Sequence, residues 1–92
     1  VNSFACKETE NIFEGKRSRK FPPDILTRAR RKLIQLHNAQ SIKDMRVPPS
    51  NRLESLAGDL EDYWSIRINQ QWRLVFSWKE SNADEVKIVD CH

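Results

Sequence analysis

Two arginines that flank a short polar loop are the first candidates for chemistry in this chain. From Tyr63 to Trp78, apolar and polar side chains alternate with a period of two on both sides of Asn69-Gln70-Gln71. This pattern is typical of two half-buried strands joined by a tight loop. It places Arg67 directly opposite Arg73, where like charges are destabilising without a counter-ion. Two guanidiniums aimed at one spot predict a bound anion, and phosphate is the natural candidate.

The same register predicts that the large apolar side chains of this hairpin share the other face. Ile68 falls opposite Trp72, and the next apolar pairs along the two strands are Ile66 with Leu74 and Trp64 with Phe76. An exposed indole can act as a platform on which nucleic-acid bases stack. Because hairpin parity groups the tryptophans with isoleucine and phenylalanine, we interpret them as core residues.

Length, composition and charge indicate one small domain spanning residues 1–92. The formal net charge is +3 and the pI is about 9.1, a mild basic bias that suits nucleic acid or an acidic partner. Two cysteines far apart in sequence form neither a metal motif nor a disulfide scaffold. Neither a membrane-spanning run nor a signal peptide is apparent. We therefore expect a soluble protein of a reducing compartment, with no cofactor, no metal and no membrane contact.

Two helices are predicted in the first half of the chain. Residues 7–14 form a short helix that Gly15 can stop. A main helix over residues 25–39 follows, with prolines and an aspartate at its start. Its inward face is marked by apolar residues at spacings of three and four, namely Leu26, Ala29, Leu33 and Leu36. One further turn is expected at residues 41–45, and a loop at residues 48–51.

Strands account for most of the remaining chain. Residues 1–6 are predicted to form a first strand and residues 52–56 a second, followed by a turn at residues 57–59. The hairpin comes next, then a turn at residues 81–84 and a last strand over residues 85–91. The expected fold class is α+β, with an N-terminal strand and two helices packed on a mostly antiparallel sheet of about four to five strands.

Several of these segments together resemble the HigB-type killer toxins of the RelE superfamily. The matching residues are Asn51–Leu56, Gly58-Asp59, Trp64–Asn69, Gln71–Leu74 and Val89–His92. Ser3-Phe4 and the arginine-rich main helix extend the similarity over nearly the whole chain. The resemblance implies a RelE-like fold, in agreement with the α+β expectation reached from the residues alone.

The resemblance also implies a function. Such toxins are cytoplasmic, ribosome-dependent endoribonucleases of type II toxin–antitoxin systems, which cut messenger RNA by attack of the 2′-hydroxyl without a metal. The implied partner is a helix-turn-helix, HigA-like antitoxin, and operator DNA is reached only through the complex with that antitoxin. The reaction requires a general base, cations for the charge that develops on the phosphate, and a general acid.

The candidate catalytic residues are Arg67, Arg73, His92, Glu54 and Asp90. The resemblance puts the two arginines on the phosphate and a C-terminal histidine beside the active site, where its ordinary pKa suits proton transfer. The alternatives are two solvated arginines and a frayed terminus. Asp90 is expected either to orient His92 or Arg73, or to be a structural acceptor. Glu54 stands where some relatives have histidine, so it is either the general base or a solvated side chain.

The candidate RNA-binding residues are Arg67, Arg73, Asn69, Arg30 and Arg31, although a charged helix face is more often simply solvated. Two positions depart from the family pattern. Ala57 stands where lysine is common, and Cys91 stands where tyrosine is usual. These departures leave a second interpretation open, in which a catalytically weakened homologue acts mainly as an antitoxin-binding co-repressor module.

Overall fold

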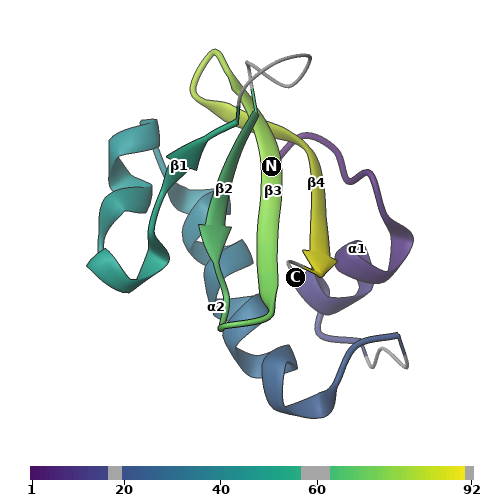
Figure 1. The fold of residues 1–92 in the computed structure, drawn as a ribbon. Coiled ribbons are helices and arrows are strands. Elements are labelled where there is room, and N and C mark those ends of the chain that lie inside the picture. Colours follow the sequence, from purple (N-terminus) through teal and green to yellow (C-terminus); the bar gives the residue numbers. More distant parts are fainter. Residues whose placement is uncertain (17–19, 57–62, 91–92) are drawn as a thin grey trace.

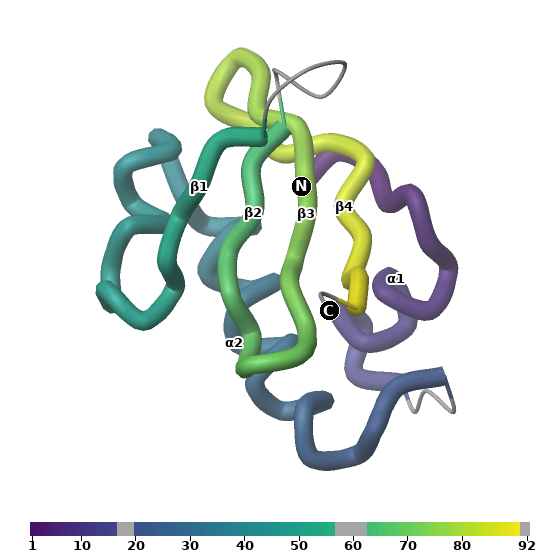
Figure 2. Tube along the Cα trace, in the orientation of Figure 1, coloured from purple at the N-terminus to yellow at the C-terminus, as the bar shows by residue number. Residues whose placement is uncertain are grey.

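A computed structural model gives the fold of residues 1–16, 20–56 and 63–90. Its centre is a four-stranded antiparallel sheet in the order β1-β2-β3-β4 (Figure 1). The strands are β1 (Glu54–Ser55), β2 (Tyr63–Arg67), β3 (Trp72–Lys79) and β4 (Asn82–Asp90). The long helix α2 crosses behind the sheet, as the tube in Figure 2 also shows. The short helix α1 lies beside β4, where the Ile88 N–H donates to Thr9 Oγ1 at 3.1 Å. The expected α+β architecture is therefore confirmed.

Both predicted helices are present. The first, α1 (Lys7–Phe13), is followed by Gly15 at φ 83°, a left-handed conformation that glycine adopts without steric cost. The second, α2 (Pro23–Asn38), has proline in its first turn and buries Ile25, Ala29, Leu33 and Leu36. Two short 3-10 helices, η1 (Ile42–Arg46) and η2 (Pro49–Asn51), then carry the chain back towards the sheet. The first of these is the predicted extra turn, whereas the second lies where a loop was predicted.

The register of the central hairpin matches the prediction. Trp64 pairs with Phe76, Ile66 with Leu74, and Arg67 with Arg73. The connecting loop is closed by the Asn69 side chain, whose Oδ1 accepts hydrogen bonds from the backbone N–H groups of Gln71 and Trp72, each at 2.8 Å. A side chain that mimics a backbone turn in this way is the reason that asparagine favours such positions.

The predicted first strand at residues 1–6 is wrong. In place of a strand, an isolated parallel bridge joins Phe4 to Val86. Backbone hydrogen bonds accompany it, from Asn2 N–H to the Ala83 carbonyl at 2.8 Å, from Ala5 N–H to the Val86 carbonyl at 2.9 Å and from Val86 N–H to the Ser3 carbonyl at 3.2 Å. The pairing stays local because β4 is irregular here. Its register against β3 shifts between Val75 and Ser77, and Glu85 has a positive φ of 54°. A bulge of this kind bends β4, so an extended segment beside it can pair with it over only a few residues.

Two strand boundaries also differ from the prediction. The segment predicted at residues 52–56 narrows to Glu54–Ser55, because Arg52 has a left-handed φ of 47° that ends η2. The last strand begins at Asn82, not at residue 85. Glu80 and Ser81 both have positive φ values, as a tight two-residue hairpin turn requires, and this turn lets the next residues pair at once. The predicted turn at residues 57–59 lies outside the described residues.

The hydrophobic core lies between α2 and the inner face of the sheet. Leu33, Leu74 and Phe76 are completely buried there. The three tryptophans pack against this core but are only partly buried. Trp72, at the loop end, meets Phe21 edge to face at a centroid distance of 5.3 Å. Hairpin parity therefore predicted the correct face for the indoles, although they lie at the margin of the core. Among the described helices, none has the length and apolar character needed to cross a membrane.

Asn51 ties the 3-10 segments to α2. Its side chain is fully buried, and Nδ2 donates to the carbonyls of Met45 at 3.0 Å and Val47 at 3.3 Å. The Oδ1 of Asn51 in turn accepts a hydrogen bond from Lys32 Nζ on α2. We expect Asn51→Ala to lower the free energy of unfolding by about 1–3 kcal/mol, because it removes the donor to the buried Met45 carbonyl. Urea denaturation measures this. Asn38→Ala, at an exposed helix end, is the control, and equal midpoints for the two variants would contradict the assignment.

Candidate functional site

The candidate site lies on the outer face of the sheet, which faces the viewer in Figure 1, opposite α2. Strand pairing brings one residue from each strand into a single row across this face: Glu54, Ser65, Val75 and Lys87. The neighbouring row contains Arg67, Arg73 and Val89. Strand alternation puts all of these side chains on the same side of the sheet, away from the core. The predicted arginines and Glu54 thus do share one face.

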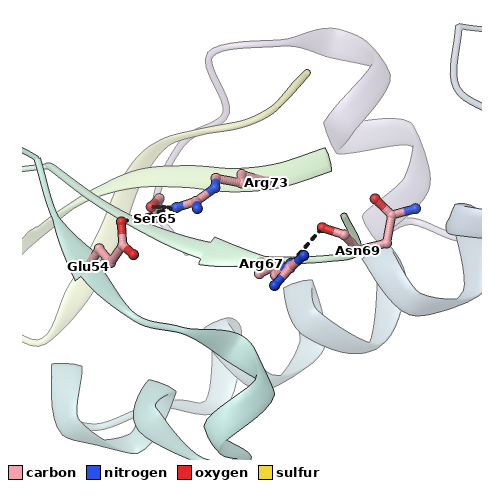
Figure 3. A network of polar contacts seen from close by, with 5 residues as sticks. All are labelled: Glu54, Ser65, Arg67, Asn69 and Arg73. Carbon is pink, nitrogen blue, oxygen red and sulfur yellow. Dashed lines mark hydrogen bonds and ion pairs between the residues drawn. The ribbon is translucent and has the colours of Figure 1, made fainter. Parts of the chain in front are cut away.

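Arg73 on β3 is held in place by two acceptors, Ser65 on the neighbouring strand β2 and Glu54 on β1, one strand further away. Its Nη1 donates to Glu54 Oε2 at 3.2 Å and to Ser65 Oγ at 3.2 Å (Figure 3). Ser65 is buried, whereas the carboxylate of Glu54 is more than half exposed. The guanidinium is therefore oriented by a fixed hydroxyl and by an accessible anion that another anion can displace.

A hollow of about 380 Å³ lies around Arg73, and we call it the Arg73 hollow. Its described lining is Leu56, Tyr63, Ser65, Arg73, Val75, Lys87 and Val89. The Lys87 side chain is exposed on β4. The hollow thus joins two cations, one phenol and one hydroxyl on an apolar floor. This set of donors fits a phosphate group together with the apolar face of a sugar or base.

Arg67 belongs to a different depression. Its Nε donates to the backbone carbonyl of Asn69 at 3.1 Å. The side chain lines a groove of about 860 Å³ between α2 and the β2–β3 loop, which we call the α2 groove. The described lining consists of Arg28, Arg31, Lys32, Gln35, Ser50, Arg52, Arg67, Ile68, Asn69 and Gln70.

The expectation that the two guanidiniums are aimed at one spot is therefore wrong for this structure. The pair is directly opposed along the strands, as predicted. Each side chain nevertheless turns to its own acceptor, Arg73 to Glu54 and Arg67 to the loop carbonyl, as Figure 3 shows. Mutual repulsion between like charges favours this divergence, and an acceptor on each side makes it possible.

The two helix arginines are also separated. Arg31 lines the α2 groove, whereas the Arg30 guanidinium lies beside Gly15 at the end of α1. Consecutive residues on a helix point about 100° apart, so Arg30 and Arg31 leave α2 in different directions. Asn69 lines the α2 groove next to Arg67, as its prediction as an RNA contact requires.

Asp90 does not orient Arg73. It pairs with Trp72, so it lies on the sheet face opposite to that of Arg73, and its Oδ2 accepts a hydrogen bond from Gln71 Nε2 at 3.2 Å. The period of two on β3 accounts for this, because neighbouring residues project to opposite faces. The predicted role of His92 and the two departures, Ala57 and Cys91, lie outside the described residues.

Lys87 and Tyr63 were missed as site residues by the sequence-based prediction. The signal for Lys87 was present, because it alternates with two apolar residues, Val86 and Ile88, which the structure buries. Tyr63 likewise shares the parity of Ser65 and Arg67. What the sequence lacked was the pairing of β4 with β3, which brings Lys87 beside Val75 and so next to Arg73. Within the described ranges, no three His, Cys, Asp or Glu side chains are grouped as metal ligands would be.

Comparison with known proteins places this chain in a family. The model of the RelE-like toxin HigB of type II toxin–antitoxin systems matches residues 2–92. Toxin HigB-1 of Vibrio cholerae is 43% identical over 81 residues, covering 87% of this chain and 85% of the relative. Endoribonuclease HigB of Proteus vulgaris is 27% identical over 92 residues, covering 100% of this chain and 99% of the relative. An uncharacterized protein of Haemophilus influenzae is 31% identical over 67 residues, covering 73% of this chain and 66% of the relative. The chain belongs to the HigB family of RelE-like toxins from type II toxin–antitoxin systems.

Proposed function

We propose that this chain is a ribosome-dependent endoribonuclease that cleaves messenger RNA. The observation that carries the proposal is the Arg73 guanidinium. It is fixed by Ser65 and Glu54 on the open face of the sheet, beside Lys87. Membership of the HigB family supports the proposal, as does the printed activity of the Proteus vulgaris relative, an endoribonuclease.

Cleavage proceeds by attack of the ribose 2′-oxygen on the adjacent phosphorus. The 2′-oxygen–phosphorus bond forms, the phosphorus–5′-oxygen bond breaks, and the products are a 2′,3′-cyclic phosphate and a 5′-hydroxyl. Negative charge builds up on the non-bridging oxygens, which fixed cations stabilise most effectively. Arg73 supplies such a cation from the centre of the Arg73 hollow, and Lys87 supplies a second one from β4.

The ion pair between Arg73 and Glu54 gives the carboxylate a role. An incoming phosphate competes with Glu54 for the guanidinium and displaces it, so the carboxylate is released beside the reacting group. A carboxylate freed in this position can accept the proton of the 2′-hydroxyl as the general base. The general acid for the 5′-oxygen is His92, on the strength of the family resemblance alone.

The antitoxin partner follows from the type II family. We propose a helix-turn-helix, HigA-like antitoxin that neutralises the toxin and carries it to operator DNA, so this chain reaches DNA only within that complex. The ribosome and its bound message are the other partners, which places the action of the protein in the cytoplasm. The net charge of +3 favours association with RNA phosphates.

Inducible expression together with cut-site mapping tests the proposal. Induction without the antitoxin is expected to arrest growth and to produce cuts within translated messages, and blocking translation initiation on a reporter message is expected to remove its cuts. Growth without arrest, combined with tight operator binding that depends on the antitoxin, would overturn the nuclease proposal. That result would support the co-repressor interpretation.

Lys87 provides a second test of the chemistry. We expect Lys87→Ala to lower the cleavage rate by about 10-fold to 100-fold, because it removes one cation from the transition state. Cleavage of a translated message by purified toxin measures this. Lys43→Ala on η1 removes an equivalent charge from an exposed position outside both depressions, so it serves as the control. Equal rates for the two variants would remove Lys87 from the reaction.

A further inference from the structure

The α2 groove concentrates positive charge in one depression. One face of α2 contributes three of the cations, Arg28, Arg31 and Lys32. The other two are Arg52, which directly follows η2, and Arg67, the last residue of β2. Among the described residues that line it, there is no carboxylate. Five cations gathered without an anion repel one another, and a bound polyanion relieves that repulsion.

The remaining polar lining of the groove consists of hydrogen-bond donors suited to an anion. Gln35, Ser50, Asn69 and Gln70 contribute amides and a hydroxyl beside the cations. Lys32 is anchored by Asn51, and burial together with the neighbouring Arg28 lowers the pKa of its amino group. The helix holds Arg28, Arg31 and Lys32 at spacings of three and four, so they are presented side by side along the groove wall.

Arg67 connects this groove to the Arg73 hollow. The two arginines are direct partners across the hairpin, so their Cα atoms lie roughly 5 Å apart. Their guanidiniums diverge, one towards Ser65 and the other into the α2 groove. A strand of nucleic acid whose scissile phosphate sits on Arg73 therefore meets Arg67 with a neighbouring phosphate and then enters the groove.

We propose that the α2 groove binds the backbone phosphates of the RNA strand next to the scissile linkage, so that Arg67 is a substrate-binding and not a catalytic residue. This inference rests on the proposed RNA substrate. An acidic protein segment has the same charge, but nothing in the groove favours it, whereas continuity with the Arg73 hollow favours a strand that occupies both. Of the two neighbouring arginines on α2, Arg31 lines the groove and binds RNA. The Arg30 guanidinium lies outside the groove, beside Gly15.

Binding of a single-stranded RNA oligonucleotide with 2′-O-methyl groups throughout tests the proposal without any cleavage. The double variant Arg28→Gln and Arg31→Gln is expected to weaken binding by about tenfold or more at physiological salt. It is also expected to reduce the slope of log affinity against log salt by about 1.4, since each phosphate contact on a single strand contributes about 0.7. Fluorescence anisotropy over a salt series measures both quantities.

The matched control is Arg46→Gln with Lys79→Gln. It removes the same net charge from exposed positions outside the groove, and it is expected to change RNA affinity by less than about twofold. Circular dichroism verifies that both double variants fold. Equal losses in the two pairs would reduce the effect to overall charge and overturn the proposal. If the Arg28→Gln and Arg31→Gln variant bound RNA normally but bound the antitoxin more weakly, the RNA proposal would be overturned in favour of an acidic protein partner.

Kinetics with Arg67→Gln separate this inference from the proposed function. On translated messages we expect a raised KM with kcat nearly unchanged, whereas a fall in kcat alone would overturn the binding role.

If the wild-type toxin cleaves no message and the double variant of Arg28 and Arg31 still loses RNA affinity, the nuclease proposal fails and the groove proposal stands. If cleavage proceeds and that double variant binds RNA normally, the groove proposal fails by itself.

Discussion

Replacing Arg73 by alanine is expected to lower RNA cleavage by about 10²-fold or more. The guanidinium is the best-oriented cation on the open face, held by Ser65 and Glu54 at 3.2 Å each. A pre-oriented charge stabilises the transition state without having to reorganise during the reaction, and removal of one such contact typically costs 10²-fold to 10³-fold. Single-turnover cleavage of a translated message, together with growth arrest on induction, measures the loss.

Two further variants show whether the effect of Arg73→Ala is specific to this side chain. Arg73→Lys keeps a charge but not the fork that can contact two oxygens, so its rate should fall between those of wild type and alanine. Arg46→Ala removes an exposed arginine of η1 and should leave the rate unchanged. Urea denaturation of each variant verifies folding, because the lost contacts with Ser65 and Glu54 also affect stability. A folded Arg73→Ala protein with less than a threefold loss of rate would exclude this residue from the site.

Phe76→Ala is expected to lower the free energy of unfolding by about 3–5 kcal/mol, the range for removal of a large aromatic side chain from a core. Phe76 has no exposed surface, and it contacts Trp78 edge to face at a centroid distance of 6.5 Å. It also lies on the central strand β3, between β2 and β4. The cavity left behind cannot collapse without moving α2 or a neighbouring strand. Urea denaturation with a common slope for wild type and variant measures the change.

The graded controls for Phe76 come from the same core. Trp64 is its direct cross-strand partner but is only partly buried, so Trp64→Ala should be less destabilising. Val47→Ala removes a side chain that is 66% exposed and should change stability by less than about 0.5 kcal/mol. If Trp64→Ala proved more destabilising than Phe76→Ala, the core would be centred on the tryptophans and not on the α2-facing side of β3.

The central hairpin shows how much of the fold could be predicted. Alternation with a period of two and one polar loop sufficed to pair Trp64 with Phe76 and Arg67 with Arg73, because strand register is a local property once the loop is placed. Helical spacing likewise predicted three of the residues that α2 buries, Ala29, Leu33 and Leu36. At the start of the helix Ile25 is buried, whereas the predicted Leu26 is only partly buried. The N-terminal pairing was not predictable, because it depends on a bulge in β4, a strand that lies far from it in sequence.

The sequence by itself determined which face of the hairpin carries the arginines, since parity along a strand admits only one answer. Only the tertiary structure decided where their charged ends go. Arg73 is turned by Glu54 from β1 and joined by Lys87 from β4, while Arg67 is drawn towards the loop and the α2 groove. Those neighbours come from segments separated along the chain. Periodicity specifies the direction of a Cα–Cβ bond, but the position of a long side chain depends on the acceptors and charges that the fold brings around it.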